Sequence, residues 1–236
     1  SGLIGWVHNC DTLNKLIKEQ RAMSNTIPNI EHNYLNKYNQ KYESSKLLNK
    51  VETFLEIINY TKGEELKKII WVKSKNCESW FIRTTNYSKS LAVMSILGYI
   101  LGLGDRHLNN LLMNRKNGQI VHIDFGDCFE VAMKRDKFPE KVPFRLTRML
   151  VKALGITEIE GMFRITCERI MSLLRKNKDS LIAILSALIH NPLISFRLMI
   201  PMLIKKQKYK KMINNFENEN ISNSVVDEVM FKSDST

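Results

Sequence analysis

Four side chains between residues 105 and 124 have the chemistry needed to act on a phosphate group. They are Asp105, His107, Asn110 and Asp124. Oxygen ligands such as the Asn110 amide and the Asp124 carboxylate suit Mg²⁺, which neutralises charge on phosphates. Asp105 precedes Asn110 by five residues, and its carboxylate could orient a hydroxyl group and accept the proton of that group. The residue types therefore predict a site for phosphoryl transfer.

Two local signals predict how these side chains come together. An apolar stretch that breaks at two glycines should deliver Asp105 into a loop. Two segments with strand composition follow, Leu111–Met113 and Gln119–Ile123, and the Asn-Gly pair between them is a signal for a hairpin turn. The hairpin should return the chain so that Asp124 lies beside the catalytic loop.

The order of these residues resembles that of known kinases. Asp105 and Asn110 keep the five-residue spacing of protein-kinase catalytic loops, and residues 124–126 spell the D-F-G motif. The histidine follows the aspartate by two residues, and the resulting pattern D-R-H-x-x-N resembles the phosphatidylinositol-3-kinase-like superfamily. Over roughly residues 1–204 the chain resembles the target-of-rapamycin (TOR) kinases in particular. The segments that carry this resemblance are Asn86–Met94, Gly98–His107, His122–Glu130 and Phe138–Leu150.

The resemblance implies a mainly α-helical fold with a small β-hairpin, the C-terminal lobe of a PI3K/PI4K-like protein kinase. No glycine-rich phosphate loop precedes Gly5 or occurs elsewhere. We therefore expect the N-lobe to be absent from the chain, and the isolated polypeptide to transfer little or no phosphate. The implied organisation is a hinge segment at 1–10, a C-lobe at 11–204 with a catalytic loop at 102–110 and an activation loop at 124–148, and a basic then acidic tail at 205–236.

The resemblance also implies a role for each matching residue. Asp105 and His107 would be catalytic, the first orienting the acceptor hydroxyl and the second stabilising charge on the transferring phosphoryl group. Asn110 and Asp124 would bind Mg²⁺. The nucleotide would contact Trp6, Val7, Thr12, Leu112 and Ile123. The expected cofactors are therefore ATP and Mg²⁺.

The chain departs from the TOR pattern at two places. Leu108 and Asn109 stand where the family usually has Pro-Ser, between the catalytic histidine and the asparagine, and we expect this change to be harmless. Leu112 replaces a methionine that commonly lines the adenine pocket. This second change should affect the fit of inhibitors more than catalysis.

Three functions remain open at this stage. The first is a TOR-type Ser/Thr protein kinase in growth and nutrient signalling, because residues 126–150 resemble the TOR activation loop nearly word for word. Lipid kinases usually carry a denser basic cluster here, which grips the phosphates of an inositol headgroup. The alternatives are a phosphoinositide lipid kinase and a non-catalytic, truncated kinase that serves as an interaction module.

We expect residues 24–60 to be a partner-binding insertion. Residues 24–50 are rich in Asn, Lys, Tyr and Ser and poor in aliphatic residues, which predicts a loop or a segment that a partner orders. TOR kinases carry at this place the insertion that binds their WD-repeat propeller subunit.

Asp11 should cap the helix that follows it. Periodicity predicts further helices at Leu47–Tyr60, Glu64–Val72, Thr166–Lys176, Asp179–His190 and Leu193–Ile204.

Composition limits the partners and the compartment. The chain has 36 Lys and Arg against 24 Asp and Glu, a net charge of +12, but the basic residues are dispersed except at 205–211, so we expect no nucleic acid partner. Four scattered cysteines argue against a zinc site or a disulfide framework and favour a cytoplasmic or nuclear protein. The sequence shows neither a membrane-spanning stretch nor a charged leader. Any membrane association should therefore be peripheral, at endomembranes and through a complex.

Overall fold

The computed structural model describes residues 3, 5–38, 44–129, 142 and 144–189. The chain divides into two compact units, Ser1–Asn177 and Lys178–Thr236, and each is described by itself. Most of the predicted activation loop, the helix predicted at 193–204 and the tail at 205–236 lie outside the described residues. None of the helices in the described part of the chain has the length and hydrophobicity that a membrane-spanning segment requires.

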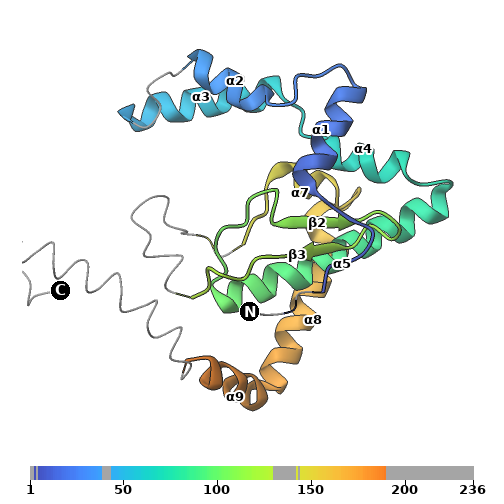
Figure 1. Cartoon of the computed structure of the whole chain (residues 1–236), viewed down its shortest axis with the longest axis vertical. Helices are drawn as coiled ribbons and strands as arrows, with labels where there is room; N and C mark the ends of the chain where they lie inside the picture. Colours follow the sequence, from blue (N-terminus) through green and yellow to red (C-terminus); the bar gives the residue numbers. More distant parts are fainter. Residues whose placement is uncertain (1–2, 4, 39–43, 130–141, 143, 190–236) are drawn as a thin grey trace, which may run out of the picture. The chain divides into compact units, whose positions relative to one another are not determined.

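A three-stranded antiparallel sheet lies at the centre of the first unit (Figure 1). Strand β1 (Cys10–Thr12) pairs with β2 (Leu111–Asn114), which pairs with β3 (Ile120–His122). The β2–β3 hairpin confirms the predicted one. Its turn needs Gly118, which has φ +77° and where a Cβ would lie 3.0 Å from the carbonyl oxygen of Arg83. Strand β1 was not predicted, because three residues are too few for a strand pattern to be recognised in the sequence.

Helix α1 (Leu13–Met23) begins directly after β1. Its N-cap is Thr12, whose hydroxyl accepts a hydrogen bond from the backbone N–H of Lys15 at 3.2 Å. The prediction that Asp11 caps this helix is therefore wrong by one residue. Asp11 lies within the paired part of β1, and its carboxylate accepts hydrogen bonds from Arg115 and Lys15 instead.

Two helices occupy the segment that follows. Helix α3 (Leu47–Tyr60) has the predicted bounds. Helix α2 (Ile30–Tyr38) lies inside residues 24–50, so the expectation of a loop is wrong for this part. A contact with another helix stabilises α2: Glu31 in its first turn pairs with the buried guanidinium of Arg21 on α1.

The next two helices lead into the catalytic loop. Helix α4 (Glu65–Val72) begins one residue after its predicted start. Helix α5 (Cys77–Leu101) opens with a capping box formed by Asn76 and Ser79. It ends at Gly102, which has a left-handed φ of +55° and where a Cβ would lie 3.1 Å from the backbone of a neighbouring segment. The predicted break in the helix is thus confirmed.

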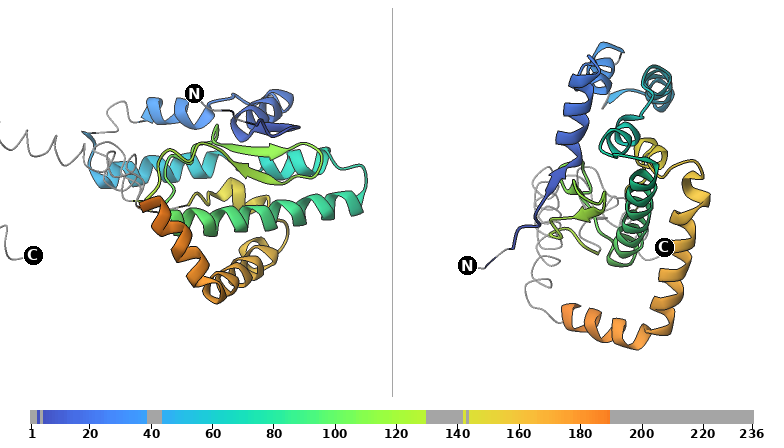
Figure 2. Two further views of the ribbon diagram at one scale, coloured as in Figure 1. Left: turned by 60° about the horizontal axis from the view of Figure 1, so that its bottom comes forward. Right: turned by 90° about the vertical axis from the view of Figure 1, so that its right-hand side faces the viewer.

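The elements of the first unit form layers. Figure 2 shows the sheet between α1 and α5, with α8 (Met162–Lys176) on the other side of α5. The short helix α7 (Arg148–Lys152) and the 3-10 helix η2 (Glu158–Glu160) precede α8. The second unit contains α9 (Lys178–Ile189). Helices α8 and α9 confirm the two helices predicted from residue 166 onwards, and each begins earlier than predicted.

The hydrophobic core lies where these layers meet, and each large apolar side chain in it contributes about 1.5–3 kcal/mol. The hydroxyl of Tyr87 donates a hydrogen bond to the carbonyl oxygen of Leu150 at 3.1 Å. Burial raises the pKa of Tyr87, so this side chain stays a neutral phenol. The core thereby fixes α5 against the hairpin, the two elements that carry the predicted site. The hydrophobic core includes Leu13, Ile17, Leu66, Ile70, Tyr87, Leu91, Leu111 and Leu150.

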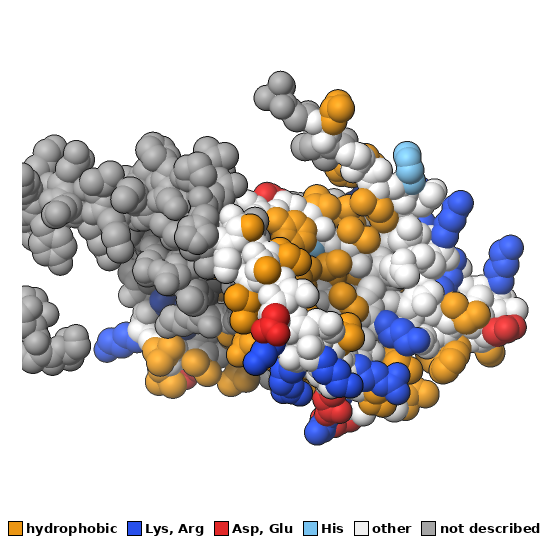
Figure 3. Space-filling model, turned by 90° about the horizontal axis from the view of Figure 1, so that it is seen from below, with side chains coloured by type: hydrophobic (Ala, Val, Ile, Leu, Met, Phe, Trp, Pro, Cys, Tyr) orange, Lys and Arg blue, Asp and Glu red, His pale blue; other side chains and the backbone are white. Residues whose placement is uncertain are grey.

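The charged side chains on one face of the molecule can be followed in Figure 3. Lys and Arg side chains run along the lower edge of this face and are interrupted by Asp and Glu, while apolar side chains occupy its middle. The excess of positive charge therefore does not form an unbroken basic surface on this face.

Candidate active site

The catalytic loop and the D-F-G segment are joined by backbone hydrogen bonds. The N–H of Gly104 donates to the carbonyl oxygen of Asp127 at 2.8 Å, and the N–H of Phe129 donates to that of Leu101 at 2.7 Å. Asp105 and Asp124 both have left-handed backbone conformations, with φ of +56° and +58°. Such conformations are strained for residues other than glycine and persist only where the surroundings enforce them. The two segments thus hold both aspartates in defined positions.

Arg106 is the buried support of the site. Its guanidinium donates hydrogen bonds to the carbonyl oxygens of Gly104 and Ile123, each at 2.7 Å, and to that of Asp124. It also lies over the ring of Phe125, 5.8 Å from the centroid. The sequence analysis misses the role of Arg106, although the position of this residue between Asp and His in D-R-H is an available signal. Its rigid fork of donors ties the catalytic loop to the D-F-G segment.

Asn110 lies against Asp105. The Nδ2 atom of the buried Asn110 side chain is 3.0 Å from the carbonyl oxygen of Asp105 and 3.5 Å from its Oδ2 atom. The carbonyl oxygen of Asn110 accepts a hydrogen bond from the N–H of Ile123 at 3.1 Å, which joins it to the end of β3. Because the amide nitrogen faces Asp105, the amide oxygen is the atom left to face a cation.

His107 and Asp105 lie close together in the catalytic loop. The Nε2 atom of His107 lies 3.9 Å from Oδ2 of Asp105, and both side chains are partly exposed to solvent. The Nδ1 atom of His107 accepts a hydrogen bond from the backbone N–H of Asn109 at 3.3 Å. The proximity of the imidazole to the carboxylate is what the predicted catalytic roles of these two residues require.

The donor set fits Mg²⁺ bound together with phosphates. Asp124 is exposed, and its Oδ1 atom accepts a hydrogen bond from the N–H of Gly126 at 3.3 Å. In the described part of the chain, no group of three or more His, Cys, Asp and Glu side chains could hold a metal ion by itself. Mg²⁺ commonly takes one or two protein oxygens and completes its shell with phosphate oxygens and water. Asn110 and Asp124 have side chains of this kind, and their binding of Mg²⁺ stays a prediction.

The predicted nucleotide contacts lie on the sheet, directly after it, and on the segment before it. Thr12 and Leu112 are paired across β1 and β2, and Leu112 is almost fully buried. Ile123 is half-buried directly after β3. Trp6 and Val7 lie on the segment before β1, with exposed side chains. The roles of all five in nucleotide binding stay predictions.

His122 is a buried histidine close to the site. Within the described residues, neither of its ring nitrogens has a hydrogen-bond partner. Burial, with a smaller contribution from the positive charge of Arg106, lowers the pKa of His122 to about 4. The side chain is therefore neutral at physiological pH, and Arg106 is the cation that supports the D-F-G segment from beneath.

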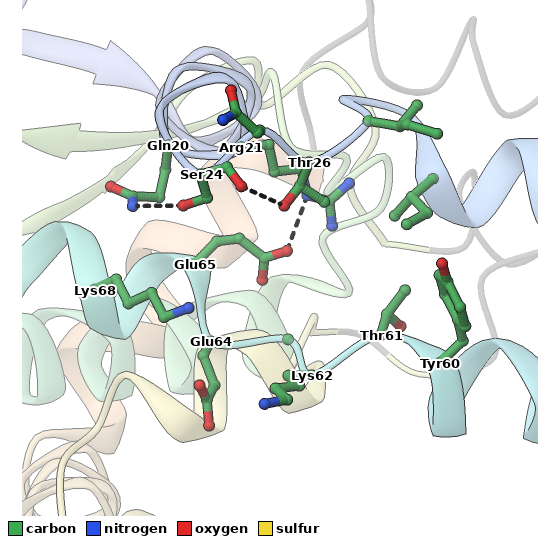
Figure 4. A pocket seen from close by; sticks show the side chains of 14 residues that line it. Gln20, Arg21, Ser24, Thr26, Tyr60, Thr61, Lys62, Glu64, Glu65 and Lys68 are labelled. Carbon is green, nitrogen blue, oxygen red and sulfur yellow. Dashed lines mark hydrogen bonds and ion pairs between the residues drawn. The ribbon is translucent and has the colours of Figure 1, made fainter.

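A cavity of about 460 Å³ lies elsewhere, between the C-terminal half of α1 and the start of α4 (Figure 4). Hydrogen bonds from Gln20 to Ser24 and from Arg21 to Glu65 form part of its wall. None of the predicted catalytic, metal-binding or nucleotide-binding residues lines this cavity. It belongs to the helical support of the fold and not to the candidate site.

Known proteins with similar sequences share most of this chain. The family model "Phosphatidylinositol 3- and 4-kinase" matches residues 1–198. The chain is 55% identical to "Serine/threonine-protein kinase TOR" of Arabidopsis thaliana over 198 residues, 84% of this chain and 8% of that protein. It is 54% identical to "Serine/threonine-protein kinase mTor" of Drosophila melanogaster over 199 residues, also 84% of this chain and 8% of that protein. The chain therefore spans about a twelfth of the length of these relatives.

Solved structures agree with the sequence comparison. The chain is similar to the "Tel1 kinase butterfly symmetric dimer", with a TM-score of 0.66 and 33% identity over 75% of this chain and 7% of that chain. It is also similar to the "FAT and kinase domain of CtTel1", with a TM-score of 0.61 and 31% identity over 74% of this chain and 12% of that chain.

Proposed function

Because this chain belongs to the phosphatidylinositol 3- and 4-kinase family and is of the TOR type within it, we propose that it is the catalytic part of a Ser/Thr protein kinase. It transfers the γ-phosphoryl group of Mg-ATP to protein hydroxyls. The observation that supports this proposal is the attachment of Asp124, through Arg106 and the backbone hydrogen bond from Ile123 to Asn110, to the loop in which Asp105 lies close to His107 and Asn110.

Each side chain has a distinct task in this mechanism. Asp105 orients the acceptor hydroxyl and takes its proton late in the transfer. His107, 3.9 Å from Asp105, stabilises negative charge on the transferring group. Asn110 and Asp124 would hold Mg²⁺ through their side-chain oxygens, and the ion would supply positive charge beside the phosphates. Arg106 keeps Asp124 in place through the backbone carbonyl oxygen of that residue.

A protein hydroxyl is the acceptor favoured here over a lipid. Three relatives that are 53–55% identical over the matched residues are named as Ser/Thr protein kinases, and the sequence at 126–150 lacks a dense basic cluster. Phosphoinositide kinase activity is the alternative. A role in growth and nutrient signalling, in the cytoplasm with peripheral recruitment to membranes through a complex, belongs to the same proposal.

An assay of the intact native protein tests this proposal. With radiolabelled ATP and Mg²⁺, we expect label on Ser and Thr of a protein substrate and none on phosphatidylinositol vesicles. Chelation of Mg²⁺ with EDTA should abolish the transfer, and excess Mg²⁺ should restore it. Labelling of the lipid alone would favour the lipid-kinase alternative. Absence of any transfer would favour the non-catalytic interaction module.

Helix α3 is the proposed site for a partner subunit. Five apolar side chains on it are exposed, with between 44% and 77% of their surface accessible: Leu47, Leu48, Val51, Phe54 and Leu55. An apolar surface of this kind is typical of a protein interface. It supports our proposal that a WD-repeat propeller subunit binds the segment 24–60, as expected from the TOR resemblance.

Charged substitutions on α3 should release this partner. We expect Leu48→Asp combined with Phe54→Asp to remove the propeller subunit from the purified native complex. Burial of two carboxylates in an apolar interface is strongly unfavourable. Quantitative mass spectrometry of the purified protein measures the loss, and Ile182→Asp on α9, another exposed apolar position, is the control. Retention of the subunit at the normal ratio would refute the proposed interface.

A further inference from the structure

Asn14 on helix α1 is hydrogen-bonded to the catalytic loop. The backbone N–H of Asn14 donates to the carbonyl oxygen of Leu108 at 3.1 Å. Its side-chain Nδ2 atom donates to the Oδ1 atom of Asn109 at 2.9 Å. Asn14 lies in the first turn of α1, two residues after the cap residue Thr12, which ends the paired strand β1. The catalytic loop is therefore attached to the end of α1 that directly follows the paired strand β1.

The attachment continues to the predicted catalytic histidine. The backbone N–H of Asn109 donates to Nδ1 of His107 at 3.3 Å. A backbone N–H is always a donor, so Nδ1 must be the acceptor, and in the neutral ring the proton is on Nε2. Nε2 is the atom that lies 3.9 Å from Oδ2 of Asp105. One chain of contacts thus runs from Asn14 through Asn109 to His107 and its carboxylate neighbour.

The exposure of His107 makes such a support necessary. Half of its side chain, 53%, is accessible, so packing alone does not hold the ring. In the catalytic loop, Asn110 is anchored by contacts to Asp105 and to the end of β3. The ring of His107 has only the hydrogen bond at Nδ1 to set its direction among the hydrogen bonds described. Loss of that direction would move Nε2 away from the transferring group.

We propose that Asn14 and Asn109 are positioning residues for phosphoryl transfer, which hold His107 with Nε2 directed to the reaction centre. This inference rests on the proposed function. Residues 108 and 109 are one of the two places where the chain departs from the TOR pattern. The sequence alone predicts that this change is harmless. The amide pair Asn14–Asn109 instead gives the loop a fixed attachment of its own.

The test uses Asn14→Ala, Asn109→Ala and the double variant in the intact native protein. Each single variant should lower kcat about threefold to tenfold, the rate equivalent of one net hydrogen bond. The KM for ATP and the melting temperature should stay within twofold and about 1 °C of the wild type, because the amide pair is exposed. The backbone bond from Asn14 to Leu108 is available in every variant.

The double variant separates a paired role from two unrelated effects. If the two residues act through one hydrogen bond, the double variant should be no slower than either single variant. The matched control is Asn177→Ala, because the exposed Asn177 also donates one amide hydrogen bond, to the carbonyl oxygen of Leu173 at 2.9 Å, and lies at the end of α8. It should leave kcat unchanged.

Three results would overturn the inference. An unchanged kcat in the single variants would remove the positioning role while leaving the proposed function intact. A multiplicative loss in the double variant would show that the residues act independently. A fall in melting temperature with a rise in KM for ATP would indicate a structural role only. If the wild-type protein itself transfers no phosphate, the proposed function fails and this inference fails with it.

Discussion

Asp105→Asn should lower kcat by about 10²- to 10⁴-fold, the usual contribution of a positioned acid or base. The amide cannot accept the proton of the incoming hydroxyl. The substitution is otherwise mild, because asparagine tolerates the left-handed conformation that residue 105 adopts, with φ +56°. The hydrogen bond from Asn110 to the backbone carbonyl oxygen of residue 105 can also persist. Steady-state kinetics of the intact protein measure the effect.

The same experiment distinguishes catalysis from folding. The KM for ATP should change little, since Asp105 faces the acceptor and not the nucleotide in the proposed mechanism. Asp179→Asn changes an exposed carboxylate on α9 and should leave kcat unchanged. A variant with normal turnover would show that Asp105 is not the residue that handles the hydroxyl proton. A loss accompanied by a lower melting temperature would assign the effect to folding.

Arg21→Met should lower the free energy of unfolding of the chain by about 3–5 kcal/mol, the typical cost of breaking a buried ion pair. Only 5% of the Arg21 side chain is exposed. Its guanidinium donates to Glu31 at 2.7 and 2.5 Å, to Glu65 at 2.9 Å and to the carbonyl oxygen of Pro28 at 2.7 Å. Figure 4 shows the contact with Glu65 at the edge of the cavity. Methionine fills the space and leaves these acceptors without a donor.

Urea unfolding followed by circular dichroism measures this loss. The control is Arg164→Met on α8, since Arg164 also pairs with two carboxylates, Glu160 and Glu168, but is exposed. That variant should differ little from the wild type, because water replaces such contacts. Equal effects at the two positions would refute the idea that burial makes the Arg21 cluster important.

The Arg21 cluster should also make stability depend on pH. Burial opposes ionisation of Glu31 and is the largest single influence on its pKa, but the hydrogen bonds and charge of Arg21, a backbone hydrogen bond and the charge of Arg148 together lower the pKa of Glu31 below its ordinary value. A carboxyl whose pKa is lowered by folding stabilises the fold above its ordinary pKa, and this contribution is lost as the pH falls through the lowered value. Acidification should therefore destabilise the wild type more than Arg21→Met, in which the pKa of Glu31 is no longer lowered by Arg21.

The sequence alone determined the order of the site and the elements that carry it. The break of α5 at Gly102, the β2–β3 hairpin and the bounds of α3 were predicted, because each depends on neighbouring residues. Glycine spacing, an Asn-Gly turn and apolar residues at helical intervals act within one or two turns of the chain. The close approach of Asn110 to Asp105 follows from the same local geometry.

Only the tertiary structure decided which polar residues support that site. Strand β1 pairs with β2 across about a hundred residues of chain, Arg21 meets Glu65 across 44, and Asn14 meets Asn109 across 95. The sequence gives no sign of these partners, because an arginine or asparagine is equally suited to water. Burial and direction, which are set by the packing of the whole core, turn such residues into fixed supports. The chemistry is therefore encoded locally, whereas its positioning is a property of the fold.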